Sequence, residues 1–162
     1  MSNPYEAANA FAADFRRMEY ALKRSSCVRK NKKDAQADWD RFAQDLGADF
    51  FDHVMAEGIA KTLIGQPPRQ LLADLQWSLE NPTPLANVAQ LFANGVCRVR
   101  NSYIHGEKFT GGPEGQWERD ALLIQEAHAV LNEASLFATR SSVLKSNRRK
   151  RSHLQTFDRP ST

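Results

Sequence analysis

Arg100, Asn101 and His105 lie within one short stretch, near the end of a strongly periodic apolar segment. An imidazole with an ordinary pKa of about 6.5 can give or take a proton at neutral pH. A guanidinium stays charged and binds phosphate through two parallel hydrogen bonds, which stabilises charge developing on a phosphoryl centre. The amide can orient the imidazole or hydrogen-bond a substrate. These groups suffice for cleavage of RNA without a metal, with the substrate 2′-OH as the nucleophile.

The spacing of Arg100 and His105 is a weak signal when it is taken alone. Arg148 and His153, in the basic C-terminal segment, show the same gap with no helical apolar stripe behind them. The first pair differs because it stands on a predicted helix. On that helix Arg98 shares the face of His105, so it is the alternative to Arg100, which we prefer.

A polar but almost uncharged stripe runs along this predicted helix, opposite its apolar face, if each residue turns the helix by about 100°. Exposed helix faces normally carry Lys and Glu, whereas amides can be half buried when they are hydrogen-bonded. The stripe therefore predicts a seam against another chain or the floor of a cleft. Its members are Asn87, Gln90, Asn94, Arg98, Asn101 and His105.

Helical periodicity runs through the chain and predicts the elements that position these residues. Apolar side chains recur at three- and four-residue steps over 8–22 and again over 39–54, where Gly47 is a possible break. The sequence GQPP at 65–68 stops the helical pattern, and a shorter helix is expected over 71–79. No segment alternates with a period of two residues, so no β-sheet is predicted.

Thr83 as N-cap and Pro84 at the first helical position predict where the polar-striped helix begins. Gly106 is a natural cap at its end, and Pro113 opens a final helix that is apolar over more than half its circumference. The expected architecture is all-α, a compact four- to five-helix bundle. Residues 1–139 form the helical domain, and residues 140–162 are expected to be a basic, mobile, disordered tail.

Charge is unevenly distributed along the 162 residues, although the net charge is only +3. The segment 140–162 holds seven Lys/Arg and one acid, and KRSSCVRKNKK at 23–33 holds six cations and no acid. Such clusters are either solvated segments or contacts for a phosphate backbone. Cys27 and Cys97 read as free thiols in a reducing compartment, and no apolar run reaches the roughly 20 residues that cross a bilayer. The chain is expected to be cytoplasmic.

The stretch VRNSYIHGEKF at 99–109, followed by a Gly-rich loop and a last amphipathic helix, resembles the HEPN superfamily. The signature of that family is Arg, four to six residues, then His, often with a polar residue directly after the Arg. Arg100, Asn101 and His105 match it. The segment DFRRMEYALKRSS at 14–26 also looks like the first helix of a bacterial subgroup of HEPN-like proteins.

The resemblance implies a metal-independent endoribonuclease, without a cofactor, that acts as a homodimer with one composite cleft. Arg100 would bind the phosphate, Asn101 would be a polar helper, and His105 would transfer a proton or contact the scissile phosphate. Arg98, Lys30, Lys32 and Lys33 are the candidate substrate-binding residues. Family members often act as toxins or antiviral-defence effectors, which implies RNA as substrate and an inhibitor or antitoxin protein as a further partner.

A second function stays open at this point. The same helical bundle can be a non-catalytic module that holds RNA or a protein. Retention of Arg100, Asn101 and His105 together favours the enzyme, because a pure scaffold has no need of all three.

Overall fold

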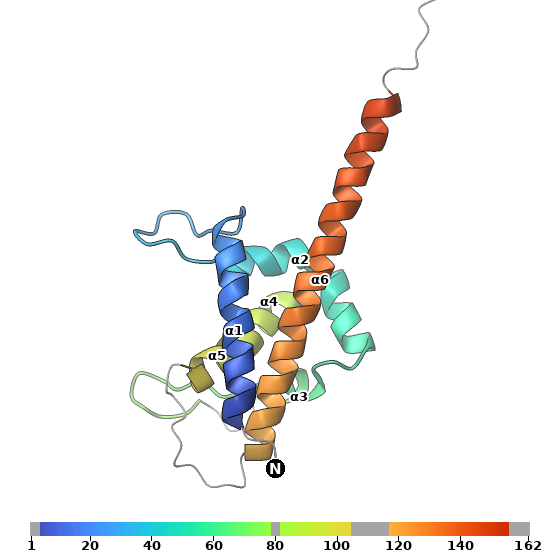
Figure 1. Ribbon diagram of the computed structural model, residues 1–162. Coiled ribbons are helices and arrows are strands. Elements are labelled where there is room, and N and C mark those ends of the chain that lie inside the picture. Colours follow the sequence, from blue (N-terminus) through green and yellow to red (C-terminus); the bar gives the residue numbers. More distant parts are fainter. Residues whose placement is uncertain (1–3, 79–81, 105–116, 156–162) are drawn as a thin grey trace, which may run out of the picture.

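The computed structural model describes residues 4–78, 82–104 and 117–155 and is an all-α bundle (Figure 1). The described residues form no strand; their only β-type pairings are two isolated bridges. Helical elements follow one another in the order α1 (Pro4–Lys23), α2 (Trp39–Ala56), α3 (Lys61–Gly65), α4 (Val88–Gln90), η1 (Leu91–Val96), α5 (Cys97–Ile104) and α6 (Trp117–Gln155).

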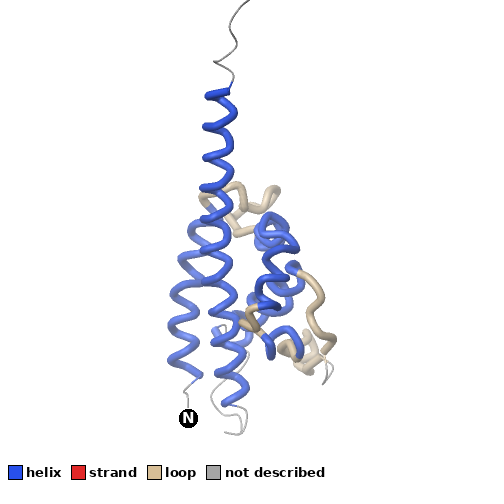
Figure 2. The backbone as a smooth tube through the Cα atoms, turned by 90° about the vertical axis from the view of Figure 1, so that its right-hand side faces the viewer, coloured by secondary structure: helices blue, strands red, loops and turns tan. Residues whose placement is uncertain are grey.

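α1 and α6 lie side by side and run in the same direction, as Figures 1 and 2 show. The predicted apolar face of α1 is buried through Ala8, Phe11 and Phe15. On its flank, the Asp14 carboxylate lies 2.6 Å from Nε2 of His128 in α6. This hydrogen bond lowers the pKa of Asp14 and joins the two longest helices of the bundle.

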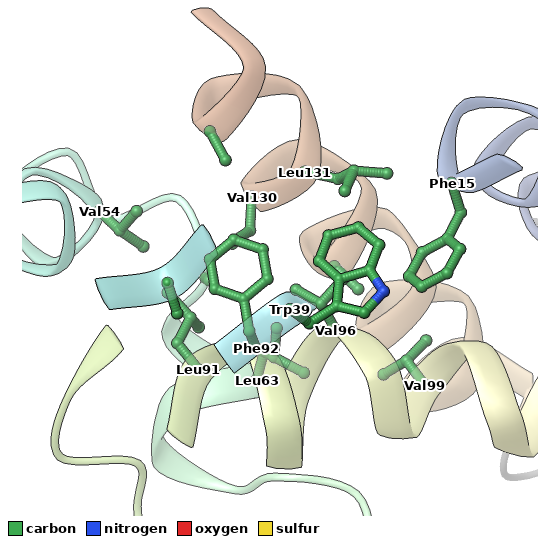
Figure 3. Close-up of a cluster of buried hydrophobic side chains, with 14 of the residues drawn as sticks. Phe15, Trp39, Val54, Leu63, Leu91, Phe92, Val96, Val99, Val130 and Leu131 are labelled. Carbon is green, nitrogen blue, oxygen red and sulfur yellow. The ribbon is translucent and has the colours of Figure 1, made fainter. Parts of the chain in front are cut away.

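The centre of the bundle is a cluster of aromatic rings between α1, α2 and η1 (Figure 3). The ring of Trp39 stacks on Phe92 at 5.9 Å between centroids and lies 4.7 Å from Phe15. Leu131 of α6 and Val96 of η1 close the cluster, both almost fully buried. The residues that carry the predicted helical periodicity of 8–22 and 39–54 therefore contribute to the core, as expected for a helix bundle.

α2 begins and bends where the sequence indicates. Asp38 caps its first turn by accepting a hydrogen bond from the backbone N–H of Arg41 at 3.1 Å. Gly47 interrupts the helix with φ 73° and ψ −176°, a conformation that is essentially restricted to glycine. The predicted break at Gly47 is confirmed.

The prediction of a helix over 71–79 is wrong. Leu71 pairs with Trp77 in an isolated antiparallel bridge, and the N–H of Leu72 donates to the carbonyl of Gln76 at 2.8 Å. Between them the chain turns at Leu75, which has a positive φ of 63° and is exposed. The leucine spacing suggested an apolar face, but the exposed Leu72 and Leu75 show that no core surface receives it.

The polar-striped helix begins later than the sequence predicts, because Asn87 and not Thr83 is its N-cap. The Asn87 side chain accepts from the N–H of Gln90 at 2.9 Å, and the Gln90 side chain accepts from the N–H of Ala86 at 2.8 Å. This reciprocal cap satisfies two backbone donors at once. Upstream, the N–H of Leu85 donates to the carbonyl of Ile64 at 2.8 Å, which holds the chain extended beside α3.

The middle of this helix is a π-helical segment, η1, and not a regular α-helix. Gly95 lies within it, and a Cβ at that position would approach Leu85 Cδ1 to 3.2 Å and Leu63 to 3.4 Å. Because each π turn holds more than 3.6 residues, the face of every later residue is rotated from the 100° prediction. Ser102, a polar residue on α5, is buried to 1% exposure.

α6 is longer than the final helix predicted from the sequence. Its middle part is buried through Ile124, Ala127, Leu131 and Ala134, as expected. Its backbone then continues as helix through Gln155 and projects beyond the bundle (Figures 1 and 2). Residues 140–155 are therefore helical where the sequence suggests a disordered tail, and the mobility of 140–162 in solution stays a prediction.

Candidate functional site

Arg100 lies on α5 and turns toward α1. Its guanidinium carbon is 5.1 Å from the centre of the Phe15 ring, and Nη2 is 4.0 Å from Oε1 of Glu19. Nη1 donates a 3.0 Å hydrogen bond to the side-chain oxygen of Asn101. The Arg100 side chain keeps 27% of its surface exposed, so the cation is oriented by its neighbours and still reaches solvent.

Asn101 is exposed and directly joined to Arg100, so these two predicted catalytic side chains lie together. The third, His105, lies outside the described residues, as do the predicted Gly106 cap and Pro113. α5 is described to Ile104, one residue before the histidine.

Arg98 faces a different part of the molecule from Arg100. Its guanidinium donates to the carbonyl of Pro68 at 3.5 Å, to Gln70 Oε1 at 3.5 Å and to Asn94 Oδ1 at 2.9 Å. Burial lowers the pKa of this guanidinium. Arg98 therefore holds the irregular segment 66–78 against the helix, and it does not lie beside Arg100.

Contacts within the chain account for most of the polar stripe that seemed to need a partner. Asn87 and Gln90 form the N-terminal cap, and Asn94 together with Arg98 holds the segment 66–78. Asn101 is the one described member of the stripe that stays exposed and outside these two networks. The polar stripe as a whole therefore does not indicate an interface with a second chain.

Lys30, Lys32 and Lys33 are exposed at the tip of the loop that links α1 to α2, which we call the basic loop (residues 24–38). Two backbone hydrogen bonds brace its base, from Arg29 N–H to Gln36 at 2.9 Å and from Asp38 N–H to Cys27 at 2.8 Å. In Figure 1 this loop extends outward from the C-terminal end of α1. The three predicted substrate-binding lysines therefore project from a braced loop.

An open groove of about 670 Å³ runs along the C-terminal half of α1 and is bordered by the basic loop through Ala35. Its other lining residues follow at steps of three and four along the end of α1 and into Arg24, the first residue of the basic loop, so they lie on one face. They are Arg16, Glu19, Tyr20, Lys23 and Arg24. The groove thus carries three cations and one carboxylate around a tyrosine that is 60% exposed.

Glu19 connects the groove to Arg100, since it lines the groove and also lies 4.0 Å from the Arg100 guanidinium. The sequence analysis missed this α1 face. The signal was present in Arg16, Tyr20, Lys23 and Arg24, which recur at helical spacing opposite the apolar stripe of the same helix. The predicted basic cluster at 23–33 includes Lys23 and Arg24 but not Arg16 or Tyr20, so it does not indicate one helix face that combines cations with an aromatic ring.

Two titratable groups on α5, Cys97 and Tyr103, are held in their neutral form. Desolvation raises the pKa of the Cys97 thiol to about 12, so it is not a thiolate nucleophile at neutral pH. Burial, together with a hydrogen bond to Asp120, raises the pKa of Tyr103. Neither side chain is therefore expected to be ionised at neutral pH.

Within the described ranges, no cluster of three or more His, Cys, Asp or Glu side chains has the arrangement of a metal site. The helices described in these ranges are too short or too polar to cross a bilayer. Comparison with protein-family models, curated proteins and solved structures finds no match. Membership of the HEPN superfamily stays a prediction.

Proposed function

We propose that the protein is a metal-independent endoribonuclease of the HEPN type. The observation that carries the proposal is the position of Arg100, which is oriented by Asn101 and Glu19, partly exposed, and adjacent to a cationic groove. A guanidinium in this setting can bind a phosphate that a neighbouring cationic surface has already attracted.

The proposed reaction uses the RNA itself as nucleophile. The ribose 2′-oxygen attacks the adjacent phosphorus as its proton passes to a base, and the bond from phosphorus to the 5′-oxygen breaks as that oxygen gains a proton. Arg100 stabilises the charge on the phosphoryl oxygens, and His105 transfers a proton. The products are a 2′,3′-cyclic phosphate and a 5′-hydroxyl end.

We also propose that two chains form the active unit, so that Arg100 and His105 of both line one cleft. Asn101 is exposed beside the partly exposed Arg100, so both side chains are accessible to a second chain. In a cell the enzyme would be a cytoplasmic toxin or antiviral-defence effector, restrained by an inhibitor or antitoxin protein.

The test compares purified wild type with Arg100→Ala and His105→Ala on total RNA in the presence of EDTA. We expect each substitution to slow cleavage about 100-fold or more, because each removes charge stabilisation or proton transfer in the transition state. His153→Ala is the matched control, since it removes the histidine of the second Arg/His pair, and it should cleave like wild type. Equal cleavage or equal inactivity of wild type and both site variants would refute the proposal.

One observation favours a second function, a non-catalytic module that binds RNA. The Arg100 guanidinium already has a hydrogen bond to Asn101 and an acidic neighbour in Glu19, as a structural arginine would. If this function is the correct one, Arg100→Ala and wild type will bind RNA equally and neither will cleave it.

A further inference from the structure

We propose that the groove along α1 binds one unpaired RNA strand, with a base stacked on Tyr20 and phosphates on Arg16 and Lys23. This rests on the proposed function only in taking RNA as the ligand. It assigns a binding surface that is distinct from Arg100, Asn101 and His105.

Tyr20 is the reason to expect an unpaired base. Its ring is 60% exposed, far more than an aromatic side chain that serves only packing. The Arg24 guanidinium lies over one face of the ring, 3.4 Å from its centre, and adds positive charge, so the base would stack on the opposite face. Stacking on an aromatic side chain requires a base whose face is free, which a base inside a duplex does not offer.

The cations on either side of Tyr20 supply the contacts to the backbone. Arg16 and Lys23 are both exposed, and they are two helical turns apart, about 10 Å along α1. Among the described residues, neither has a carboxylate within ion-pair distance. A phosphate can therefore approach each of them without displacing a carboxylate partner.

The groove also leads to the proposed reactive centre. Glu19 lies in the groove wall and faces the Arg100 guanidinium, so a strand along the groove passes close to Arg100. The basic loop supplies Ala35 to the opposite wall and carries Lys30, Lys32 and Lys33 at its tip. The combination of several cations and one exposed aromatic ring in a single groove matches a single strand, whose phosphates meet the cations while a base stacks on the ring.

The test measures binding by fluorescence anisotropy with a 2′-O-methyl oligouridylate of about 12 nucleotides, within the usual single-strand site size. This probe lacks the free 2′-OH, so it reports binding without cleavage. We expect Tyr20→Ala to weaken binding about 5- to 100-fold and Tyr20→Phe, which keeps the ring, to stay within about threefold. A duplex of the same length should bind less tightly than the single strand.

Arg16→Ser combined with Lys23→Ser should reduce the salt dependence of binding, lowering the slope of log K against log salt by about 1.4, or about 0.7 for each phosphate contact. Arg41→Ser with Lys61→Ser removes the same charge from exposed positions outside the groove, and should leave the slope unchanged. Circular dichroism of every variant verifies that the fold is retained.

Wild-type affinity in folded Tyr20→Ala, or equal slopes for the two double variants, would overturn the groove assignment. The two proposals fail separately. Binding that depends on Tyr20 without any cleavage of RNA would refute the nuclease and keep the groove. Cleavage that depends on Arg100, together with binding that Tyr20→Ala leaves unchanged, would keep the nuclease and refute the groove.

Discussion

Arg98 and Arg100 are two residues apart on one helix, yet their guanidinium groups meet different parts of the molecule. Arg98 points to the irregular segment 66–78 and binds Pro68 and Gln70, whereas Arg100 points to α1 and lies near Glu19. Both are cations near the proposed reaction, but only Arg100 lies beside the groove. The contacts show that Arg98 holds the segment 66–78, whereas its predicted substrate contact and the phosphate contact proposed for Arg100 stay predictions.

This difference predicts opposite outcomes for matched substitutions. Arg98→Gln should lower the free energy of unfolding by about 1 kcal/mol, because it removes the hydrogen bonds to Pro68 and Asn94. Limited proteolysis should then cut faster within 66–78, while RNA cleavage stays within about threefold of wild type. Arg100→Gln should give the inverse result, with protease resistance retained and cleavage lost. If Arg98→Gln abolishes cleavage while 66–78 stays protected from the protease, Arg98 acts in cleavage and does not hold this segment, which contradicts the prediction.

At the scale of the elements, α2 shows how one glycine shapes the bundle. Gly47 has a backbone conformation available essentially to glycine alone, and it lets α2 change direction between Leu46 and Phe50, both of which are buried. A Cβ at Gly47 would meet nothing within 4 Å, so crowding has no part in the requirement.

Gly47→Ala should therefore lower the free energy of unfolding by about 1–3 kcal/mol, through backbone strain alone. The measurement is chemical denaturation. Gly65→Ala is the control, because its Cβ would also meet nothing within 4 Å and its φ is not positive, so it should raise the free energy of unfolding by about 0.4–1 kcal/mol. Equal losses for the two variants would show that strain at Gly47 is not the cause.

Sequence periodicity predicts helices well where an apolar face packs into the core. It predicts them poorly where local hydrogen bonds determine the backbone conformation. The faces of α1 and α2 are correct because residues such as Phe11 and Phe50 have a core to enter. Leu72 and Leu75 are exposed, and a turn at Leu75 forms in place of the predicted helix. The π turns of η1 depend on close packing of Gly95 against Leu63, which no single-helix pattern encodes.

At the scale of the whole molecule, the bundle brings together segments that are far apart in the sequence. α5 packs against α1, so that Arg100 lies near Glu19, and Glu19 also lines the groove that the basic loop borders. The sequence predicted Arg100, Asn101 and the exposed lysines one by one. It did not predict their relation to α1, because that relation arises only when α5 packs across the first helix.

The central claim, that this assembly cleaves RNA by attack of the 2′-OH, is tested most directly by the chemistry of the product ends. Wild type is incubated with a short RNA in EDTA, and the products are analysed by mass spectrometry. We predict 2′,3′-cyclic phosphate and 5′-hydroxyl ends, which disappear with Arg100→Ala. Products with 5′-phosphate ends, or the same cyclic ends at the same rate from Arg100→Ala, would contradict the account.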